Sequence, residues 1–452
     1  MISQVFEYID ANLNRFLEKL QALCRQPSIS AQGVGLEETA KLVRDFMEEV
    51  GLEARLIPIE GGPPIVYGEV RSKSSGKTLL LYNHYDVQPP EPLEEWRYPP
   101  FDAVIEDGRI IARGASDNKG NIVSRLMVIE AFLRTFGDVP CNIKFVVEGE
   151  EEIGSPHFHR FVEEHKGLLH ADAAFWEFGG LDEKDRPVIT LGLKGILYVE
   201  LTARGAKVDL HSANAAIVES PVWRLVWALG TLKDPNENIL VAGWYDGVRD
   251  FTPEELEAIR RMPFEEEAIK REYGISRFIQ NLTGFELKRA LIGRPTCNIA
   301  GIVSGYTGAG AKTVLPSYAK AKLDFRLVPD QDPERLVRLL KAHLEKLGFG
   351  DIQVKVLSSM RAARTPITAE IVQVAREAAQ EVFQREAIIN VSSAGSGPMY
   401  FFTDLLKIPT ICIGCNHAFS NAHAPNENLR IDVFRDGSKW IANTIYKFAR
   451  KT

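Results

Sequence analysis

A histidine and an aspartate stand at the end of an apolar run in the segment LLLYNHYD, residues 79–86. The run is uncharged and rich in leucine, which is typical of a strand buried on both faces of a parallel sheet. Because side chains alternate along an extended backbone, His84 and Asp86 are expected to point the same way. His84 could therefore bind a metal ion while Asp86 orients its ring. The same pattern also fits a strand end whose two polar residues meet solvent.

Further metal-binding side chains follow predicted strands and turns along the chain. They are Asp117, Glu151, Glu152, Glu177 and His423. Two nitrogen and several oxygen donors fit zinc, with manganese or cobalt as substitutes. One carboxylate more than a single zinc ion needs suggests two ions, which in such sites lie about 3.5–4 Å apart. An isolated glutamate run such as EGEEEIGS is usually a solvated acidic turn, but its place directly after a buried strand favours a functional role.

The order of the predicted elements indicates one domain split by another. Strands alternate with helices up to residue 192, which predicts an α/β domain with a mixed, mostly parallel sheet flanked by helices. From residue 193 the order becomes β, α, β, β, α, β, the order of a ferredoxin-like α+β domain. A helix and a strand after residue 364 are typical of the first domain. We therefore expect a metal-binding domain formed by residues 1–192 and 365–452, with an inserted domain at residues 193–364.

Composition narrows the class of partner and the compartment. A net charge of −7 argues against nucleic acid or an anionic membrane surface as the main partner and favours a small molecule. Five cysteines form an odd, sparse set that suits a reducing compartment. Cys412 and Cys415 form a CxxC, but their apolar surroundings predict buried thiols. The N-terminus reads as an amphipathic helix without a signal peptide, so we expect a cytoplasmic protein that does not enter a membrane.

Seven motifs occur in one order over nearly the whole chain. They are NHYDV, RGASDNKGN, EGEEEIGS, GLKG followed by DLHS, DFRLVP, GSGPM and AHAPNE. With these motifs the chain resembles the carnosine-dipeptidase and aminoacylase family of co-catalytic zinc metallopeptidases. The resemblance implies a zinc-exopeptidase-like catalytic domain that binds two Zn²⁺ ions per subunit, or Mn²⁺ or Co²⁺ in their place.

The resemblance also assigns roles at the metal centre. It implies that one ion is held by His84, Asp117 and Glu177. The second ion would be held by Asp117, Glu152 and His423, so that Asp117 bridges the two. Glu151 would be the general base that takes a proton from the water between the ions. Asp86 would keep His84 in its metal-binding tautomer.

The inserted domain resembles the lid of this family, which is also its usual dimerisation surface, so a homodimer is expected. His211, in DLHS, matches a histidine that reaches the partner subunit's site and stabilises the tetrahedral oxyanion. Arg326 and Ser396 match groups that bind the substrate's free carboxylate. Glu427 is expected to steady the loop of His423. Without the resemblance, His211 would be an ordinary strand-end histidine. Arg326 would belong to a surface ion pair, and Ser396 to a glycine turn.

The resemblance gives conflicting indications of the substrate. Dipeptidase branches usually have aspartate where this chain has Glu177, whereas deacylase and carboxypeptidase branches usually have glutamate. RGASDNKGN and DLHS are closer to the dipeptidase branch, although Ala213 follows HS where many members have glycine. The leading hypothesis is a metal-dependent hydrolase of dipeptides or other small peptides with a free C-terminal carboxylate.

There are three alternatives to this hypothesis. The nearest is an N-acyl-amino-acid amidohydrolase with the same two metal ions. A non-catalytic binding protein is disfavoured because Glu151 and every expected metal ligand are present. A serine or cysteine hydrolase is disfavoured because no GxSxG motif or Cys/His pairing stands out.

Overall fold

The computed structural model describes residues 2–451, which form two compact units. Leu193–Ala363 and Ser392–Tyr400 make up the second unit, and the remaining described residues make up the first. Ser392–Tyr400, which carries Ser396, was expected with the first domain but groups with the second. Each unit has its own sheet and core, so each is described separately.

The first unit is built on a mixed sheet whose central strands are parallel. In order these strands are β6 (Asn142–Glu148), β3 (Thr78–His84), β7 (Ala173–Trp176) and β19 (Thr410–Cys412). Next to β6 the sheet continues antiparallel through β2 (Gly62–Val70) to β1 (Glu53–Ile59). Next to β19 it continues through β9 (Pro187–Thr190) and β8 (Gly180–Leu181) to β20 (Asn416–His417). The predicted α/β class with a mostly parallel central sheet is confirmed.

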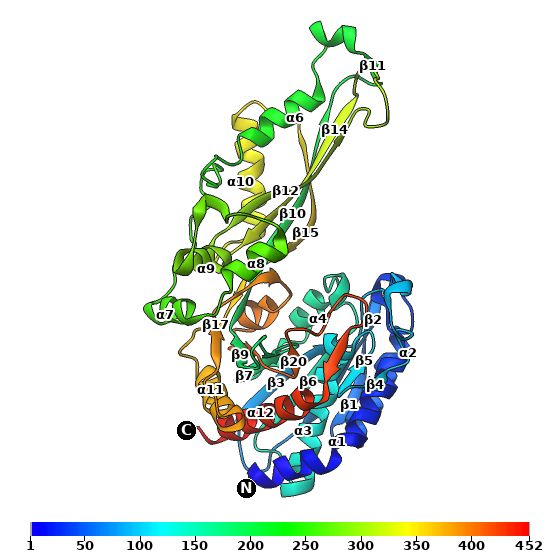
Figure 1. Cartoon of the computed structure of the whole chain (residues 1–452), viewed down its shortest axis with the longest axis vertical. Helices are drawn as coiled ribbons and strands as arrows, with labels where there is room; N and C mark the ends of the chain where they lie inside the picture. The colour runs from blue at the N-terminus through cyan, green and yellow to red at the C-terminus, as the bar shows by residue number, and fades with distance from the viewer. Residues whose placement is uncertain (1, 452) are drawn as a thin grey trace. The chain divides into compact units, whose positions relative to one another are not determined.

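Long helices cover this sheet. α1 (Ile2–Arg25), α3 (Gly120–Phe136) and α12 (Ile431–Arg450) lie side by side, and α12 also packs on α11 (Glu370–Phe383) (Figure 1). The predicted amphipathic N-terminal helix is confirmed, because α1 buries Val5, Ile9, Phe16 and Leu20. α3 is buried on nearly all sides and has no polar face. It therefore forms part of the core beneath the strand ends.

A small sheet brings two distant segments of the first unit together. β5 (Arg109–Ile111) pairs antiparallel with β4 (Val104–Glu106) on one side and with β21 (Asn428–Arg430) on the other. β5 precedes Asp117 in the sequence, and β21 follows His423. The pairing therefore places two candidate metal ligands near one another although they are far apart in the sequence.

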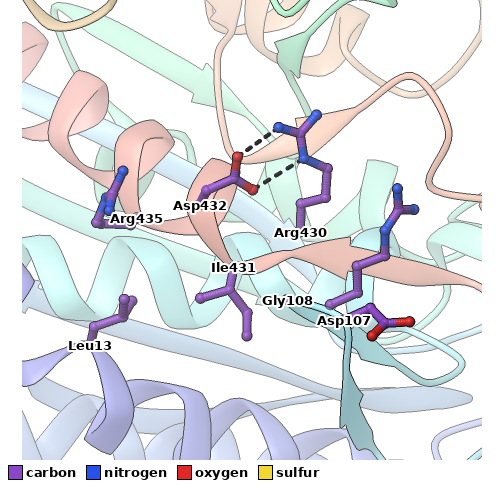
Figure 2. A pocket seen from close by; sticks show the side chains of 8 residues that line it. Leu13, Asp107, Gly108, Arg430, Ile431, Asp432 and Arg435 are labelled. Carbon is purple, nitrogen blue, oxygen red and sulfur yellow. Dashed lines mark hydrogen bonds and ion pairs between the residues drawn. The ribbon is translucent and has the colours of Figure 1, made fainter.

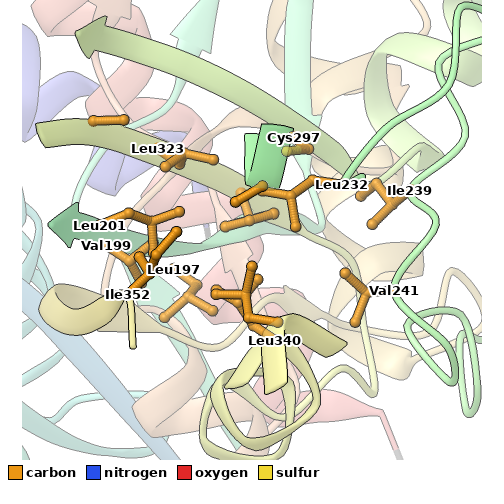
Figure 3. Packing of buried hydrophobic residues seen from close by; sticks show 14 of the residues in the cluster. Leu197, Val199, Leu201, Leu232, Ile239, Val241, Cys297, Leu323, Leu340 and Ile352 are labelled. Carbon is orange, nitrogen blue, oxygen red and sulfur yellow. The ribbon is translucent and has the colours of Figure 1, made fainter. Parts of the chain in front are cut away.

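The second unit has an antiparallel sheet in the order β12 (Thr296–Ser304), β14 (Tyr318–Leu327), β10 (Gly192–Arg204) and β15 (Gln353–Met360). With α6 (Pro221–Gly230) after β10 and α10 (Pro333–Lys346) after β14, this is the ferredoxin-like order that the sequence predicts. Leucine and valine side chains of β10 pack with α10 in its core, as Figure 3 shows for Leu197, Val199 and Leu340.

Two helices in this unit begin at capping residues whose pattern can be recognised in the sequence. Asp332 accepts a hydrogen bond from the backbone N–H of Arg335 at the start of α10. Thr252 and Glu255 form a capping box at the start of α7 (Pro253–Arg261). α8 (Glu266–Tyr273) and α9 (Gly284–Gly293) complete the helical segment between α6 and β12. These starts were predictable because a cap depends on neighbouring residues only.

Two further expectations concern the cysteines and the membrane. All five cysteines are free and buried, so the prediction that Cys412 and Cys415 are buried thiols is confirmed. Among residues 2–451, no helix combines the length and the apolar character that crossing a membrane requires.

Candidate metal centre

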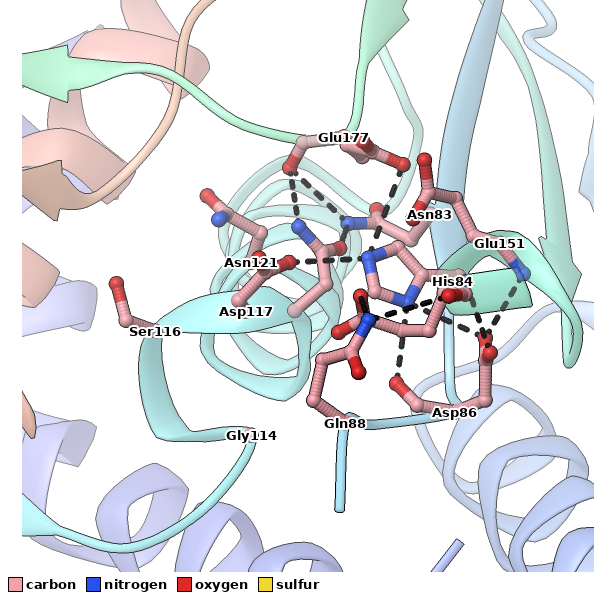
Figure 4. Close-up of polar contacts among 12 residues, drawn as sticks. Asn83, His84, Asp86, Gln88, Gly114, Ser116, Asp117, Asn121, Glu151 and Glu177 are labelled. Carbon is pink, nitrogen blue, oxygen red and sulfur yellow. Dashed lines mark hydrogen bonds and ion pairs between the residues drawn. The ribbon is translucent and has the colours of Figure 1, made fainter. Parts of the chain in front are cut away.

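The candidate site lies at the carboxyl ends of three parallel strands of the first unit. β3 ends on His84, β7 is followed directly by Glu177, and a short turn after β6 carries Glu151 and Glu152. Parallel strands present these ends at one edge of a sheet, where α/β proteins usually bind ligands. His84, Asp117, Glu151 and Glu177 point toward one another in Figure 4. The structure thus gathers side chains from four separate segments.

Asp117 lies between the two histidines. Its Oδ1 is 3.0 Å from His84 Nε2, and its Oδ2 is 3.1 Å from His423 Nε2. Each histidine has a second carboxylate beside it: Glu177 Oε2 is 3.8 Å from His84 Nε2, and Glu152 Oε2 is 3.0 Å from His423 Nε2. The six predicted metal-centre side chains other than Asp86 therefore lie together, and five of them form two groups that share Asp117.

The donor atoms fit divalent metal ions. Within each of two sets, His84 with Asp117 and Glu152 and His84 with Glu151 and Glu177, the ligand atoms lie within 4.8 Å of one another. Glu152 Oε1 and Glu177 Oε2 are buried and accept no hydrogen bond from any residue in 2–451. A buried carboxylate oxygen without a donor is costly, and a metal ion would satisfy it.

Asp86 contacts two of the segments that carry the candidate metal ligands. It is fully buried, and its Oδ1 lies 3.3 Å from His84 Nδ1. The same carboxylate accepts hydrogen bonds from the backbone N–H groups of Glu151 (3.2 Å) and Glu152 (3.0 Å). One side chain therefore fixes both the ring of His84 and the turn that carries the two glutamates.

Sequence reasoning missed several polar residues that hold the candidate ligands. Gln88 Nε2 donates to Glu152 Oε2 (2.9 Å), and Asn118 Nδ2 donates to the carbonyl of Glu177 (2.9 Å). Arg125, fully buried in α3, donates to the carbonyl of Tyr82 on β3. Gln88 directly follows the motif NHYDV and Asn118 lies within RGASDNKGN, which is the only signal the sequence offers for them. Arg125 lies in an apolar helix, and nothing local marks its role.

In the metal-free protein, burial and neighbouring groups shift the pKa values of several residues of the site. Burial raises the pKa of Glu151 to about 8, and nearby acidic residues add to this. Burial disfavours the charged form of His84, but Glu177 and hydrogen bonds with Asp117 and Asp86 outweigh it and raise the pKa of His84. Hydrogen bonds with Asp117 and Glu152 raise the pKa of His423 to about 10. Burial alone would raise the pKa of Asp117, but its two histidine partners hold it below its usual range.

These shifts predict how metal binding depends on pH. Glu151, His84 and His423 hold protons more tightly in the folded chain than in the unfolded chain, so their contribution to the free energy of unfolding of the metal-free protein should fall as the pH rises from about 6.5 to about 10. A metal ion must displace these protons. The rise in Tm on adding zinc should therefore be larger at about pH 8 than at about pH 6. Calorimetry with zinc or with chelator tests this, and a zinc-dependent rise that is the same at both pH values would contradict it.

The second unit holds the remaining predicted residues. Arg326 Nη1 donates to Ser396 Oγ (2.8 Å), which in turn donates to the carbonyl of Gly195 (3.0 Å). Their pairing joins β14 to the segment Ser392–Tyr400. His211 is exposed at the end of β11 (Leu210–His211), where its Nδ1 accepts a hydrogen bond from the N–H of Ala213. The roles of His211, Arg326 and Ser396 in substrate binding stay predictions.

A separate hollow of the first unit, about 510 Å³ in volume, lies beside the start of α12 (Figure 2). Three arginines line it, but each has a partner. Arg430 pairs with Asp432 (2.6 Å) and Asp185 (2.7 Å), and Arg435 pairs with Asp436 (2.7 Å). Arg109 donates to Asn428 (2.8 Å). Because each of these arginines already has a partner, we assign no ligand to this hollow.

Comparison with known proteins places the chain in a family. The model of peptidase family M20/M25/M40 matches residues 80–447, which include every candidate metal ligand. The chain belongs to this peptidase family, so the resemblance inferred from its motifs is confirmed.

Individual relatives agree with the fold and the enzyme class. The chain is 30% identical to the Cys-Gly metallodipeptidase dug1 of Schizosaccharomyces pombe, with 99% of this chain and 98% of that protein covered. It is 26% identical to the human Beta-Ala-His dipeptidase, covering 100% and 93%. A solved M20 family metallo-carboxypeptidase from Sulfolobus solfataricus is 41% identical with a TM-score of 0.89, covering 96% and 99%. Relatives of this chain are thus metal-dependent peptidases, and the deacylase alternative is not favoured.

Proposed function

We propose that this protein is a two-metal peptidase that hydrolyses the amide bond of dipeptides and other small peptides with a free C-terminal carboxylate. The observation that carries the proposal is the position of Asp117, whose two oxygens each contact a different histidine. This arrangement supports two neighbouring metal sites that share one carboxylate. The donor set of imidazole nitrogens and carboxylate oxygens supports zinc, with manganese or cobalt able to replace it.

Two divalent ions held there would polarise the scissile carbonyl and make a water molecule acidic enough to attack at neutral pH. Glu151 would accept the proton of that water on its carboxylate and pass it to the leaving nitrogen. Asp86 would keep His84 facing the ion and the turn of Glu151 in place, as its hydrogen bonds support. Arg326 and Ser396 would bind the substrate's terminal carboxylate, a task that suits the fork of a guanidinium group.

The proposed substrates share a free C-terminal carboxylate. The family resemblance associates a glutamate at the position of Glu177 with carboxypeptidases and deacylases. A metallo-carboxypeptidase is 41% identical to this chain. The curated relatives named above are dipeptidases. A dipeptide and a longer peptide share the group that Arg326 would recognise, so both fall within the proposal.

A matched substrate panel tests this function. After reconstitution with zinc, the protein should cleave dipeptides and short peptides, and N-acetyl amino acids with the same leaving residue should react more slowly. Amidating the C-terminus should lower kcat/KM, and Arg326→Met should remove that preference, because the guanidinium is its proposed origin. Faster hydrolysis of the acylated set, or equal rates with and without the free carboxylate, would contradict the proposal.

We further propose that the protein is a homodimer joined through the second unit. β12 is an edge strand whose Ile299, Ile302 and Val303 are exposed. On α6, Trp223 and Trp227 stack on each other, with 59% and 58% of their surfaces exposed. An open edge and a large apolar surface support an interface with a second copy. Sedimentation should give twice the mass of one chain, and a monomer at micromolar concentration would contradict the proposal.

Mixing subunits tests the proposed role of His211. If His211 acts at the metal centre of the partner subunit, His211→Ala and Glu151→Gln dimers should each have little activity. Exchanging subunits between them should restore activity, because mixed dimers contain one site with both groups. Continued inactivity after proven exchange would contradict a role across subunits.

We also propose a cytoplasmic location, because the five free cysteines suit a reducing compartment.

A further inference from the structure

A buried ion pair joins the two segments that carry Asp117 and His423. Arg113 Nη1 lies 2.8 Å from Glu427 Oε2, and both side chains are 1% exposed. Arg113 stands four residues before Asp117, and Glu427 stands four residues after His423. A buried ion pair contributes little to the free energy of unfolding on average, so stability alone does not explain why this pair lies beside the candidate metal ligands.

The carboxylate of Glu427 is inserted into the turn that carries Asp117. Its Oε1 accepts hydrogen bonds from the backbone N–H groups of Ser116 and Asp117, both at 2.9 Å. Its Oε2 accepts one from the N–H of Gly114 at 3.0 Å in addition to that from Arg113. Charge-assisted bonds to three N–H groups fix the backbone of this turn. Glu427 therefore supports Asp117, not only the loop of His423 as the sequence suggested.

Arg113 supports the other segment. Its Nη2 donates to the carbonyls of His423 and Pro89, both at 3.3 Å, and its Nη1 also reaches the carbonyl of Ala424. His423 has a backbone φ of 65°, a left-handed conformation that is unfavourable for residues other than glycine. Such a conformation persists when surrounding contacts hold it. The Arg113 contact with the carbonyl of His423 supplies one.

We infer that the Arg113–Glu427 pair is a clamp that sets the position of Asp117 relative to His423 and thereby the affinity of the metal site they share with Glu152. Neither residue of the clamp would touch the ion or the substrate, so both are positioning residues. The other metal site also uses Asp117, but its two remaining ligands are supported from outside the clamp, since Asp86 holds His84 and Asn118 holds Glu177. The inference rests on the proposed metal centre and adds that the site with two clamped ligands, Asp117 and His423, depends more on the clamp than the site with only one.

Two variants probe the clamp without leaving a large cavity. Glu427→Gln keeps the shape of the side chain but removes its charge, and Arg113→Lys keeps a charge but loses the fork that reaches the three carbonyls. Glu130→Gln is the matched control, because Glu130 is also buried and paired with an arginine, Arg15, between α3 and α1. All three should lose some thermal stability in chelator.

The experiment is a zinc titration of the full-length chelated proteins in competition with a chromophoric chelator. The wild type and Glu130→Gln should each bind two ions. Glu427→Gln and Arg113→Lys should keep one tight ion, and the second should need about 10–100-fold more free zinc, the usual effect of removing a group that orients a ligand. Absorption of the Co²⁺-loaded proteins should change for the weakened site only.

The outcomes separate the clamp from the metal centre. If the wild type binds two ions and both clamp variants bind them with the same affinities, the clamp is wrong and the metal centre stands. If Glu130→Gln loses as much affinity as Glu427→Gln, general loss of stability accounts for the effect and the clamp is again wrong. A wild type that binds neither zinc nor cobalt overturns the metal centre and the clamp together.

Discussion

Glutamine in place of Glu151 should lower kcat by about 10²–10⁴-fold or more while both metal ions stay bound. The carboxylate is the only group in the proposed mechanism that takes the proton from the attacking water, and glutamine cannot accept it. The side chain lies against the metal centre, where its N–H is held by Asp86. In the metal-free protein burial raises the pKa of Glu151 to about 8, so the site favours a proton on this carboxylate.

Steady-state kinetics and metal analysis on the same samples test the role of Glu151. Glu150→Gln is the matched control, because Glu150 precedes Glu151 and pairs with His157 (2.8 Å) away from the two histidines of the site. We expect the control to stay within a few-fold of the wild type. Near-normal kcat for Glu151→Gln would remove Glu151 from the role of base. Loss of metal from this variant would instead make it a ligand.

Alanine in place of Asp117 should abolish tight binding of both metal ions. Among residues 2–451, Asp117 is the one side chain whose oxygens contact both histidines, so its loss removes a ligand from each site at once. His84→Ala and His423→Ala provide the comparison, since each should weaken mainly one ion. Metal content after dialysis at fixed free zinc measures the effect. Two ions retained by Asp117→Ala would show that the sites do not share this carboxylate.

Local patterns in the sequence were enough to predict the elements that position the site. The apolar strand before His84 and the acidic turn after β6 depend on neighbours within a few residues. The same is true of the capping residues of α7 and α10. The β, α, β, β, α, β order likewise predicted the ferredoxin-like sheet, because the pairing of neighbouring strands and the preferred handedness of crossovers leave few arrangements for such a sequence of elements. The proposed ligands were chosen by the same strand ends together with the family motifs.

The supports of the site could not be predicted in this way. Arg113 and Glu427 are separated by 314 positions, and their pairing exists only because β21 is placed beside β5 in the fold. Arg125 lies in an apolar helix, yet it donates to backbone carbonyls at the ends of β3 and β7. Tertiary contacts of this kind leave no periodic or local trace. The grouping of Ser392–Tyr400 with the second unit was missed for the same reason.

The most direct test of the two-metal site is a crystal structure of the zinc-loaded protein with anomalous diffraction data recorded at the zinc absorption edge. The account predicts two anomalous peaks per chain, about 3.5–4 Å apart. One peak should lie beside His84 and Glu177 and the other beside Glu152 and His423, with one oxygen of Asp117 facing each. A single peak, or two peaks that do not flank Asp117, would contradict the account.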